Sequence, residues 1–368
     1  MKRLIHLTCN PIAFEKCAKQ ITNAKNNNYW IQLSPPQGNR VAIPNHLLPK
    51  EPGIIISSGG SINGPHHCLQ PFSHLDQSAI STGQWLKKIG LEPKECRIFN
   101  PLPLHHVSGL MAWWRSQTWG AKHNWLIPSL MRNPIELEKS CQSLFKKKID
   151  PLILSLVPTQ LQRLINTSAG LRWLQSFDVI WLGGSGLSNT LAMQARRQNI
   201  RLAPCYGSTE TAAMVTVLTP KEFLAGEKNC GSPLADIELR LNHFGALEVK
   251  TKRLAVGNFK ESDLQTLETN DGWWQSGDLA KLITDNCLLR LEILGRLDTA
   301  IHSGGETIFP EKLESKILKS AKNKKLQVQS IIFIPVNNKE WGQRLVGLIR
   351  WEESLTTHQK EKQFKTIK

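Results

Sequence analysis

Short apolar runs, each followed by a glycine-rich or polar turn, alternate with helix-like stretches along much of this 368-residue chain. The runs at 53–57, 178–182 and 200–204 have the length and composition of strands that are buried on both faces. Helix-like stretches lie between them, at 158–165 and 187–195. This alternation predicts an α/β fold with a large multi-layer domain.

The pattern changes after about residue 297. One amphipathic helix is predicted at 310–318, and strands are predicted at 330–334 and 344–349. This order is typical of a small α+β domain. We therefore predict a large N-terminal domain at 1–297 and a small C-terminal domain at 298–368.

The chain carries a net charge of +16 and has a pI near 9.6. Its basic residues are spread along the sequence, and no helix-turn-helix, zinc-finger or RNA-binding signature accompanies them. Spread charge is more typical of a solvated surface than of a nucleic-acid interface. We therefore expect no nucleic-acid partner, and a positive field of this kind also suits small polyanions.

The eight cysteines are scattered and form no C-x-x-C pair, which argues against a zinc site and a disulfide framework. No stretch approaches the roughly 20 apolar residues of a membrane helix, and no signal-peptide run follows the first residues. We expect a soluble cytoplasmic protein with no membrane insertion. Whether it forms a homo-oligomer stays open.

A turn rich in glycine and hydroxyl side chains follows the predicted strand at 53–57. Such a turn can direct backbone N–H groups inward as an anion nest, while hydroxyls donate to phosphate oxygens. An ordinary glycine-rich turn is the alternative interpretation. The candidate phosphate ligands are Ser58, Gly59, Gly60, Ser61, Asn63 and Gly64.

A second polar segment, at 206–211, follows the predicted strand at 200–204 and precedes a helix-like run. Its side chains are therefore expected at the carboxyl end of a strand, where open α/β sheets bind ligands. Glu210 offers the hard oxygen that Mg²⁺ shares with phosphates. The alternative is a helix start with Ser208 or Thr209 as its cap.

The segments 206–211, 272–278 and 295–306, in this order and spacing, resemble the signature of adenylate-forming acid:CoA ligases. The resemblance implies ATP, Mg²⁺ and coenzyme A as ligands, with a small carboxylic acid as substrate. It places Tyr206 and Gly207 beside adenine, the Thr209 hydroxyl on phosphate and Glu210 on Mg²⁺. Thr209 and Glu210 are thus catalytic candidates.

The same resemblance assigns roles to residues nearer the carboxyl end. Asp278 and Arg296 match the ribose contacts, although a Gly-Asp pair is otherwise a common turn. Asp298 matches the hinge about which the small domain rotates between the two half-reactions. Gly304 and Gly305 match the passage of the CoA pantetheine arm, although a flexible turn is the alternative there.

The acyl side of the site resembles the family at 101–110, where His106 aligns with a family histidine and is a third catalytic candidate. A satisfied core histidine is the alternative. The segment at 155–164 resembles the o-succinylbenzoate:CoA ligases of menaquinone and phylloquinone synthesis. His106, Ser108, Gly184 and Ser185 are the predicted acyl-pocket residues, and Gly184 is also placed near adenine.

The chain departs from the family at several points. Asn63 replaces a glycine and His66 replaces a lysine in the phosphate loop, and the N-terminal part is abbreviated. The family's catalytic lysine has no counterpart in a Gly-Lys context at Lys365 or Lys368, so we expect that lysine, or a tail that carries it, to be missing. Three hypotheses follow: an o-succinylbenzoate:CoA ligase, another acid:CoA ligase or carrier-protein adenylation domain, and a non-catalytic nucleotide-binding protein.

Overall fold

The fold is given by a computed structural model that describes residues 3–38, 41–58, 66–146, 149–260, 263–267, 269–285, 288–303, 306–338, 340–352 and 355–367. The chain divides into two compact units. The first comprises Met1–Arg240, Glu248–Gln275 and Leu282–Glu292, and the second comprises Leu241–Leu247, Ser276–Lys281 and Ile293–Lys368. The predicted domain boundary at residue 297 stays a prediction.

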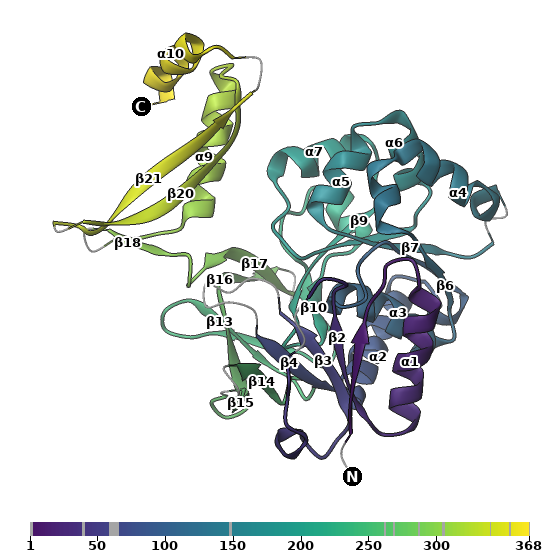
Figure 1. Ribbon diagram of the computed structural model, residues 1–368. Coiled ribbons are helices and arrows are strands. Elements are labelled where there is room, and N and C mark those ends of the chain that lie inside the picture. The colour runs from purple at the N-terminus through teal and green to yellow at the C-terminus, as the bar shows by residue number, and fades with distance from the viewer. Residues whose placement is uncertain are drawn as a thin grey trace. The chain divides into compact units, whose positions relative to one another are not determined.

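The first sheet of the first unit has the strand order β1-β2-β3-β4-β14-β15 (Figure 1). These strands are β1 (Leu4–Thr8), β2 (Trp30–Ser34), β3 (Gly53–Ser57), β4 (His67–Pro71), β14 (Gly257–Lys260) and β15 (Asp263–Thr266). The first three run parallel, and the others pair antiparallel. Ile54 and Ile56 face one apolar core and Ile55 faces another, which confirms the predicted strand at 53–57, buried on both faces.

Three helices supply most of the apolar side chains that cover Ile54 and Ile56, namely α1 (Phe14–Asn26), α2 (Phe72–Lys88) and α3 (Val107–Trp119). Both α2 and α3 also contact strands of the second sheet, so these two helices lie between the sheets. Short 3-10 turns complete this part of the unit, η1 (Asn45–Leu47) and η2 (Pro93–Glu95). The result is the layered arrangement that the sequence predicts.

The second sheet has seven strands in the order β11-β10-β9-β8-β7-β5-β6. They are β5 (Arg97–Asn100), β6 (Lys122–Trp125), β7 (Leu152–Leu156), β8 (Val179–Leu182), β9 (Leu202–Ser208), β10 (Ala213–Val217) and β11 (Ser232–Pro233). Strands β5 to β9 are parallel, whereas β10 and β11 are antiparallel to their neighbours. The carboxyl ends of five parallel strands therefore share one edge.

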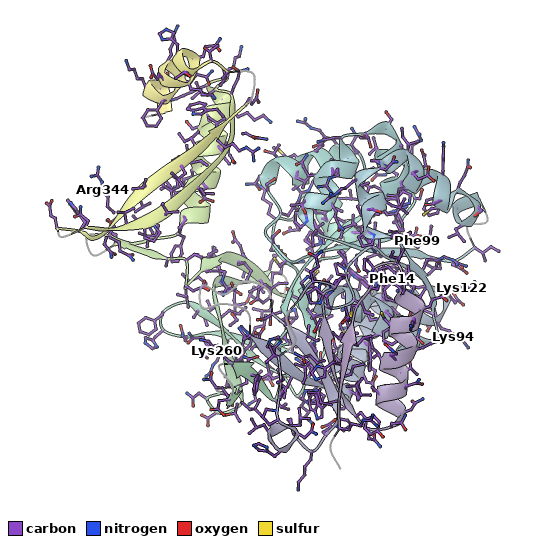
Figure 2. The ribbon with its side chains drawn as sticks, viewed as in Figure 1. Phe14, Lys94, Phe99, Lys122, Lys260 and Arg344 are labelled. Atoms are coloured by element: carbon purple, nitrogen blue, oxygen red, sulfur yellow. The ribbon has the colours of Figure 1, made fainter. Side chains whose placement is uncertain are left out.

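Figure 1 shows α4 to α7 gathered along one face of this sheet. The helices of this region are α4 (Pro134–Lys146), α5 (Pro158–Ile165), α6 (Ser168–Gln175), α7 (Asn189–Arg197) and α8 (Pro220–Leu224), and η3 (Pro128–Arg132) precedes them. Phe99 is fully buried in the core beneath them, whereas the Lys122 side chain is 57% exposed (Figure 2). The predicted helices at 158–165 and 187–195 are confirmed.

A third sheet has the order β12-β13-β16-β17, and its residues are divided between the two units. Its strands are β12 (Glu238–Leu241), β13 (Ala246–Lys250), β16 (Trp273–Asp285) and β17 (Leu288–Arg296). Asp278 lies on β16, and Arg296 is the last residue of β17. Two of the predicted ligand-binding residues therefore come from this sheet.

The carboxyl-terminal part of the second unit is built on a sheet with the order β19-β18-β21-β20. Its elements are β18 (Ile301–Ser303), β19 (Glu306–Ile308), α9 (Pro310–Asn323), β20 (Val328–Asn338), β21 (Gly342–Trp351) and α10 (Thr357–Ile367). Glu314 of α9 accepts a hydrogen bond from the backbone N–H of Phe333 at 2.9 Å, which ties the helix to β20. The helix and two strands predicted here are confirmed.

The described ranges bear on two expectations, which concern membrane-spanning helices and cysteines. Their helices include none that is long and apolar enough to cross a membrane. Seven cysteines fall within these ranges, and all seven are free thiols.

Candidate active site

The base of the predicted phosphate loop is the end of the hairpin between β3 and β4. The backbone N–H of Ser58 donates to the carbonyl of His66 at 2.9 Å, and its hydroxyl donates to the same oxygen at 3.3 Å. Ser58 and His66 therefore stand opposite each other where the loop leaves the sheet. The other predicted phosphate ligands, Gly59, Gly60, Ser61, Asn63 and Gly64, lie outside the described residues.

The segment that carries Glu210 is a tight turn between β9 and β10, so the prediction of a following helix is wrong. The backbone N–H of Ser208 donates to the Thr211 hydroxyl at 3.0 Å, and that hydroxyl donates to the carbonyl of Ala213 at 2.8 Å. A Cβ atom at Gly207 would collide with the same carbonyl, so the approach of the strands requires glycine there. Helix capping is thereby excluded as the role of Ser208 or Thr209.

Glu210 and His66 are in direct contact. Nε2 of His66 lies 3.0 Å from Oε1 of Glu210, and the two side chains are only 21% and 12% exposed, respectively. Burial opposes ionisation of Glu210, but hydrogen bonds from His66, from the backbone and from Ser208 outweigh it and hold its pKa below the ordinary value. The site therefore presents an ionised, largely buried carboxylate beside the phosphate loop.

That carboxylate fits Mg²⁺ as a hard oxygen ligand. No group of three or more His, Cys, Asp or Glu side chains with metal-binding geometry occurs within the ranges that the structure covers. Mg²⁺ is usually held by one or two carboxylates together with substrate phosphates, so a single glutamate beside a phosphate loop is sufficient.

The predicted acyl-pocket residues follow two other strands of the same sheet. His106 immediately precedes α3, which follows β5, and Ser108 is in the first turn of that helix. Gly184, with φ +83°, and Ser185 form the turn after β8. Strand β7 lies between β5 and β8 in the sheet. The pair His106 and Ser108 and the pair Gly184 and Ser185 therefore lie at the same edge of the sheet, at two separate positions along it.

The two histidines before α3 are neutral at pH 7. Desolvation lowers the pKa of His105 to about 4, where the neighbouring His106 also opposes protonation, and desolvation lowers the pKa of His106. Their ring centroids are 4.4 Å apart. A neutral imidazole at this edge can accept or donate a hydrogen bond without adding charge.

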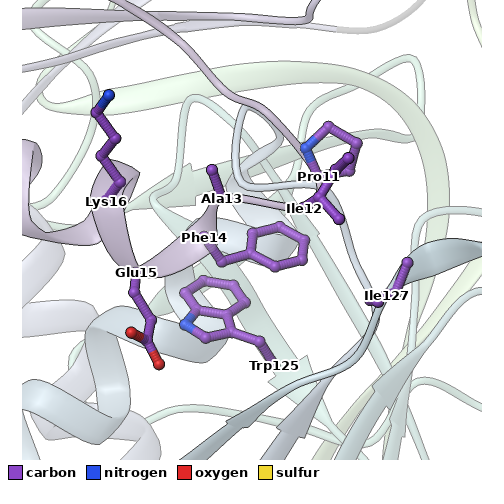
Figure 3. Close-up of a pocket in the computed structure, with 8 residues that line it drawn as sticks. All are labelled: Pro11, Ile12, Ala13, Phe14, Glu15, Lys16, Trp125 and Ile127. Atoms are coloured by element: carbon purple, nitrogen blue, oxygen red, sulfur yellow. The ribbon is translucent and has the colours of Figure 1, made fainter.

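Figure 3 shows a separate apolar pocket of about 340 Å³ in the first unit. It lies where the chain leaves β1 and β6, and the rings of Phe14 and Trp125 stack in its wall with centroids 4.4 Å apart. Its lining residues are Pro11, Ile12, Ala13, Phe14, Glu15, Lys16, Trp125 and Ile127. It includes none of the predicted acyl-pocket residues.

In the second unit, the predicted ribose and hinge residues form one charged cluster. Nη1 of Arg296 lies 3.7 Å from Oδ1 of Asp278. Arg296 also binds Asp298 through two parallel hydrogen bonds of 2.7 and 2.9 Å, which lower the pKa of the Asp298 carboxyl. Gly304 and Gly305, predicted for the CoA passage, lie outside the described residues.

Residues 71–248 match the family described as AMP-binding enzyme. This segment of the chain resembles that family. The predicted resemblance to adenylate-forming enzymes is thus confirmed, and the matched range contains the Glu210 turn, His106 and Gly184.

The 2-succinylbenzoate–CoA ligase of Oceanobacillus iheyensis is 29% identical to this chain over 302 residues, which are 79% of this chain and 58% of that protein. The enzyme of the same name from Escherichia coli K12 is 32% identical over 251 residues, or 68% of this chain and 49% of that protein. The chain therefore spans less than two thirds of the length of these relatives.

Solved structures share the fold of this chain. The o-succinylbenzoate coenzyme A synthetase of Bacillus subtilis, in complex with ATP and magnesium ion, superposes with a TM-score of 0.72 at 18% identity, covering 100% of this chain and 83% of that one. The same enzyme with its acyl-adenylate intermediate gives a TM-score of 0.72 at 18% identity, covering 99% and 81%. The predicted α/β fold is confirmed.

Two buried polar residues beneath the Glu210 turn were not predicted from the sequence. Gln70 on β4 and Arg253 before β14 both donate hydrogen bonds to backbone carbonyls of the turn. A glutamine in a short strand and an arginine in a lysine-rich segment resemble ordinary surface residues. Gln70 and Arg253 could have been identified only from the pairing of β14 with β4, two strands that lie far apart in the sequence.

Proposed function

We propose that this chain is an ATP-dependent acid:CoA ligase that acts on o-succinylbenzoate. The contact between His66 at the base of the phosphate loop and Glu210 after β9 carries the proposal, because it places an ionised carboxylate beside the predicted phosphate site. The names of the relatives and the segment at 155–164 support this acid as the substrate.

The first half-reaction joins the acid to AMP. An oxygen of the substrate carboxylate forms a bond to the α-phosphorus of ATP while the bond from that phosphorus to pyrophosphate breaks, and pyrophosphate leaves with the electron pair. Ser58 and Thr209 hydroxyls would bind phosphate oxygens, and Glu210 would hold Mg²⁺, which would offset negative charge on the phosphates. Catalysis of this kind depends mostly on positioning and on charge stabilisation.

The nucleoside is held by residues of other elements. Tyr206 and Gly207, with Gly184, lie along the adenine, whereas Asp278 accepts hydrogen bonds from the ribose hydroxyls and Arg296 adds a second ribose contact. The pair between Arg296 and Asp278, at 3.7 Å, supports the assignment of both to one ligand group.

The second half-reaction transfers the acyl group to CoA. The thiol sulfur forms a bond to the acyl carbonyl carbon, the bond from that carbon to the phosphate oxygen breaks, AMP leaves and the thiol proton passes to solvent. Gly304 and Gly305, which lie outside the described residues, are assigned to the passage of the pantetheine arm, and rotation about Asp298 would exchange the two states. His106, Ser108 and Ser185 line the acyl side.

The proposed compartment is the cytoplasm, and the partners are small molecules. The seven described cysteines are free, and burial raises the pKa of Cys9, Cys96 and Cys205 to about 12, so these thiols resist oxidation.

Pyrophosphate release with a panel of carboxylic acids tests the proposal. We expect release with o-succinylbenzoate above that with benzoates and fatty acids, and loss of release in Glu210→Gln. Glu138→Gln is the matched control, since Glu138 on α4 pairs with Arg172 at 2.7 Å and lies outside the proposed site. Preference for another acid would support a different ligase, and ATP binding without release would support a non-catalytic role.

A further inference from the structure

The turn that carries Glu210 has a backbone that its sequence does not favour. Ala212 and Ala213 have φ values of +50° and +79°, in the left-handed region that residues with a Cβ atom seldom adopt. Conformations of this kind persist only where the surrounding structure enforces them. Ser78 contacts this turn from beneath through a hydrogen bond to the Ala212 carbonyl, and two further buried side chains make most of the other contacts.

Arg253 is the first of these side chains, and it is 0% exposed. Its Nη1 donates to the carbonyls of Thr211 and, at 3.4 Å, of Ala212, and its Nη2 donates to the carbonyl of Met214. Asp236 balances the charge, with Oδ2 2.8 Å from Nε of Arg253. One guanidinium thus joins three carbonyls of the turn and of β10.

Gln70 is the second side chain, and it is also 0% exposed. Its Nε2 donates to the carbonyl of Thr209 at 2.7 Å and to that of Glu210 at 3.0 Å. Both acceptors are carbonyl oxygens, so the amide has one orientation only. The backbone N–H of Ala255 donates to the Glu210 carbonyl at 2.7 Å, so the segment next to Arg253 also holds the turn.

We propose that Arg253 and Gln70 are positioning residues that fix the backbone of residues 209–214 from its buried side and so hold the Glu210 carboxylate in its Mg²⁺-binding position. The proposal rests on the proposed function, in which Glu210 is the metal ligand. Neither side chain reaches a substrate, because both are enclosed and their donors are directed at backbone carbonyls. Such outer contacts set how well a ligand side chain binds its metal.

The test uses Arg253→Met and Gln70→Met in the full chain, with Arg290→Met as the matched control. Arg290 is 8% exposed and pairs with Glu222 at 2.8 Å, as Arg253 pairs with Asp236 at 2.8 Å. The first readout is amide hydrogen exchange of peptides that cover 207–214, without any ligand. The second is the Mg²⁺ concentration that gives half-maximal pyrophosphate release with o-succinylbenzoate and ATP.

We expect faster exchange of the turn in both positioning variants and a half-saturating Mg²⁺ concentration that rises about 10- to 100-fold. Arg253→Lys, which restores the charge and part of the hydrogen bonding, should recover some of the loss. Arg290→Met should lower thermal stability while leaving both readouts at their wild-type values. If Arg253→Met does not fold, the two measurements are made on Gln70→Met alone.

Unchanged exchange of the turn in a folded variant, or unchanged Mg²⁺ dependence despite faster exchange, would overturn the proposal. The exchange readout needs no turnover. A wild-type chain without pyrophosphate release would therefore count against the proposed function, while the exchange of the turn would still decide whether Arg253 and Gln70 hold it.

Discussion

The imidazole of His66 and the carboxylate of Glu210, 144 residues apart in the chain, are hydrogen bonded at 3.0 Å. Because Glu210 is ionised, Nε2 of His66 carries the proton of this bond. The histidine stands where the family has a lysine in its phosphate loop. The contact therefore links the two segments from which triphosphate and Mg²⁺ binding are proposed.

Because His66 replaces a lysine of the family's phosphate loop, we expect its side chain to contribute to ATP binding, and replacing it tests that role. His66→Ala should raise the KM for ATP about 10-fold or more, because a hydrogen bond to a charged group contributes about 1.5–3 kcal/mol. His66→Lys should keep or lower the KM, since it restores a cation. Steady-state pyrophosphate release at saturating Mg²⁺ measures both, and equal KM values in the three proteins would remove His66 from the ATP site.

Asp298 is predicted to act as the hinge, and its backbone rather than its carboxylate should matter most. Asp298→Pro fixes φ, so thioester formation from a preformed acyl-adenylate should fall about 100-fold, the order expected when reacting groups are displaced by about 1 Å. Asp298→Ala loses the pair with Arg296 but keeps a free φ, and it should retain most of that rate. Rapid-quench measurement of the rate of thioester formation distinguishes the two variants. Equal losses of rate in both would assign the effect to the ion pair with Arg296.

The free energy of unfolding should fall at acidic pH because of the buried His123. Burial lowers its pKa from 6.5 to about 3, so between these values the unfolded state binds a proton that the folded state excludes. The associated stability is present above pH 6.5 and declines as pH falls toward 3, by about 1.4 kcal/mol for each pH unit. His123→Phe keeps an aromatic ring against Trp125, 4.3 Å away, and should flatten this dependence.

Denaturant unfolding of the wild type and of His123→Phe at pH 8, 7, 6 and 5 measures the effect. The two proteins should differ little in slope between pH 8 and pH 7, and the wild type alone should lose stability steeply below pH 6.5. If the free energies of unfolding of the two proteins ran parallel over the whole pH range, His123 would have the same pKa in the folded and the unfolded state.

Much of the fold could be predicted because its elements have strong local signals. The apolar run at 53–57 coincides with β3 (Gly53–Ser57), and Pro158 begins α5 where a proline is favoured. The turn after β9 could not be predicted in this way. Its sequence, Glu210 followed by Thr211, Ala212 and Ala213, suits a helix, and contacts from Arg253 and Gln70 override that local preference.

The candidate site was predicted from the order of its motifs, and the ligand-binding roles of its residues stay predictions. The structure brings His66 to Glu210 and Asp278 to Arg296. The residues that support them are not marked in the sequence, because a buried polar side chain is defined by its partners. Ser78 shows this, since its hydroxyl donates to the carbonyl of Ala212 at 2.6 Å from the middle of a helix.

The central claim is that this chain makes a CoA thioester through an acyl-adenylate. Mass spectrometry of products from o-succinylbenzoate, ATP, Mg²⁺ and CoA, beside a reaction started with synthetic o-succinylbenzoyl-adenylate and CoA, tests it most directly. Thioester from the adenylate alone would show that this chain catalyses only the second half-reaction. We predict thioester in both reactions, with Glu210→Gln abolishing only the first, and thioester in neither would contradict the account.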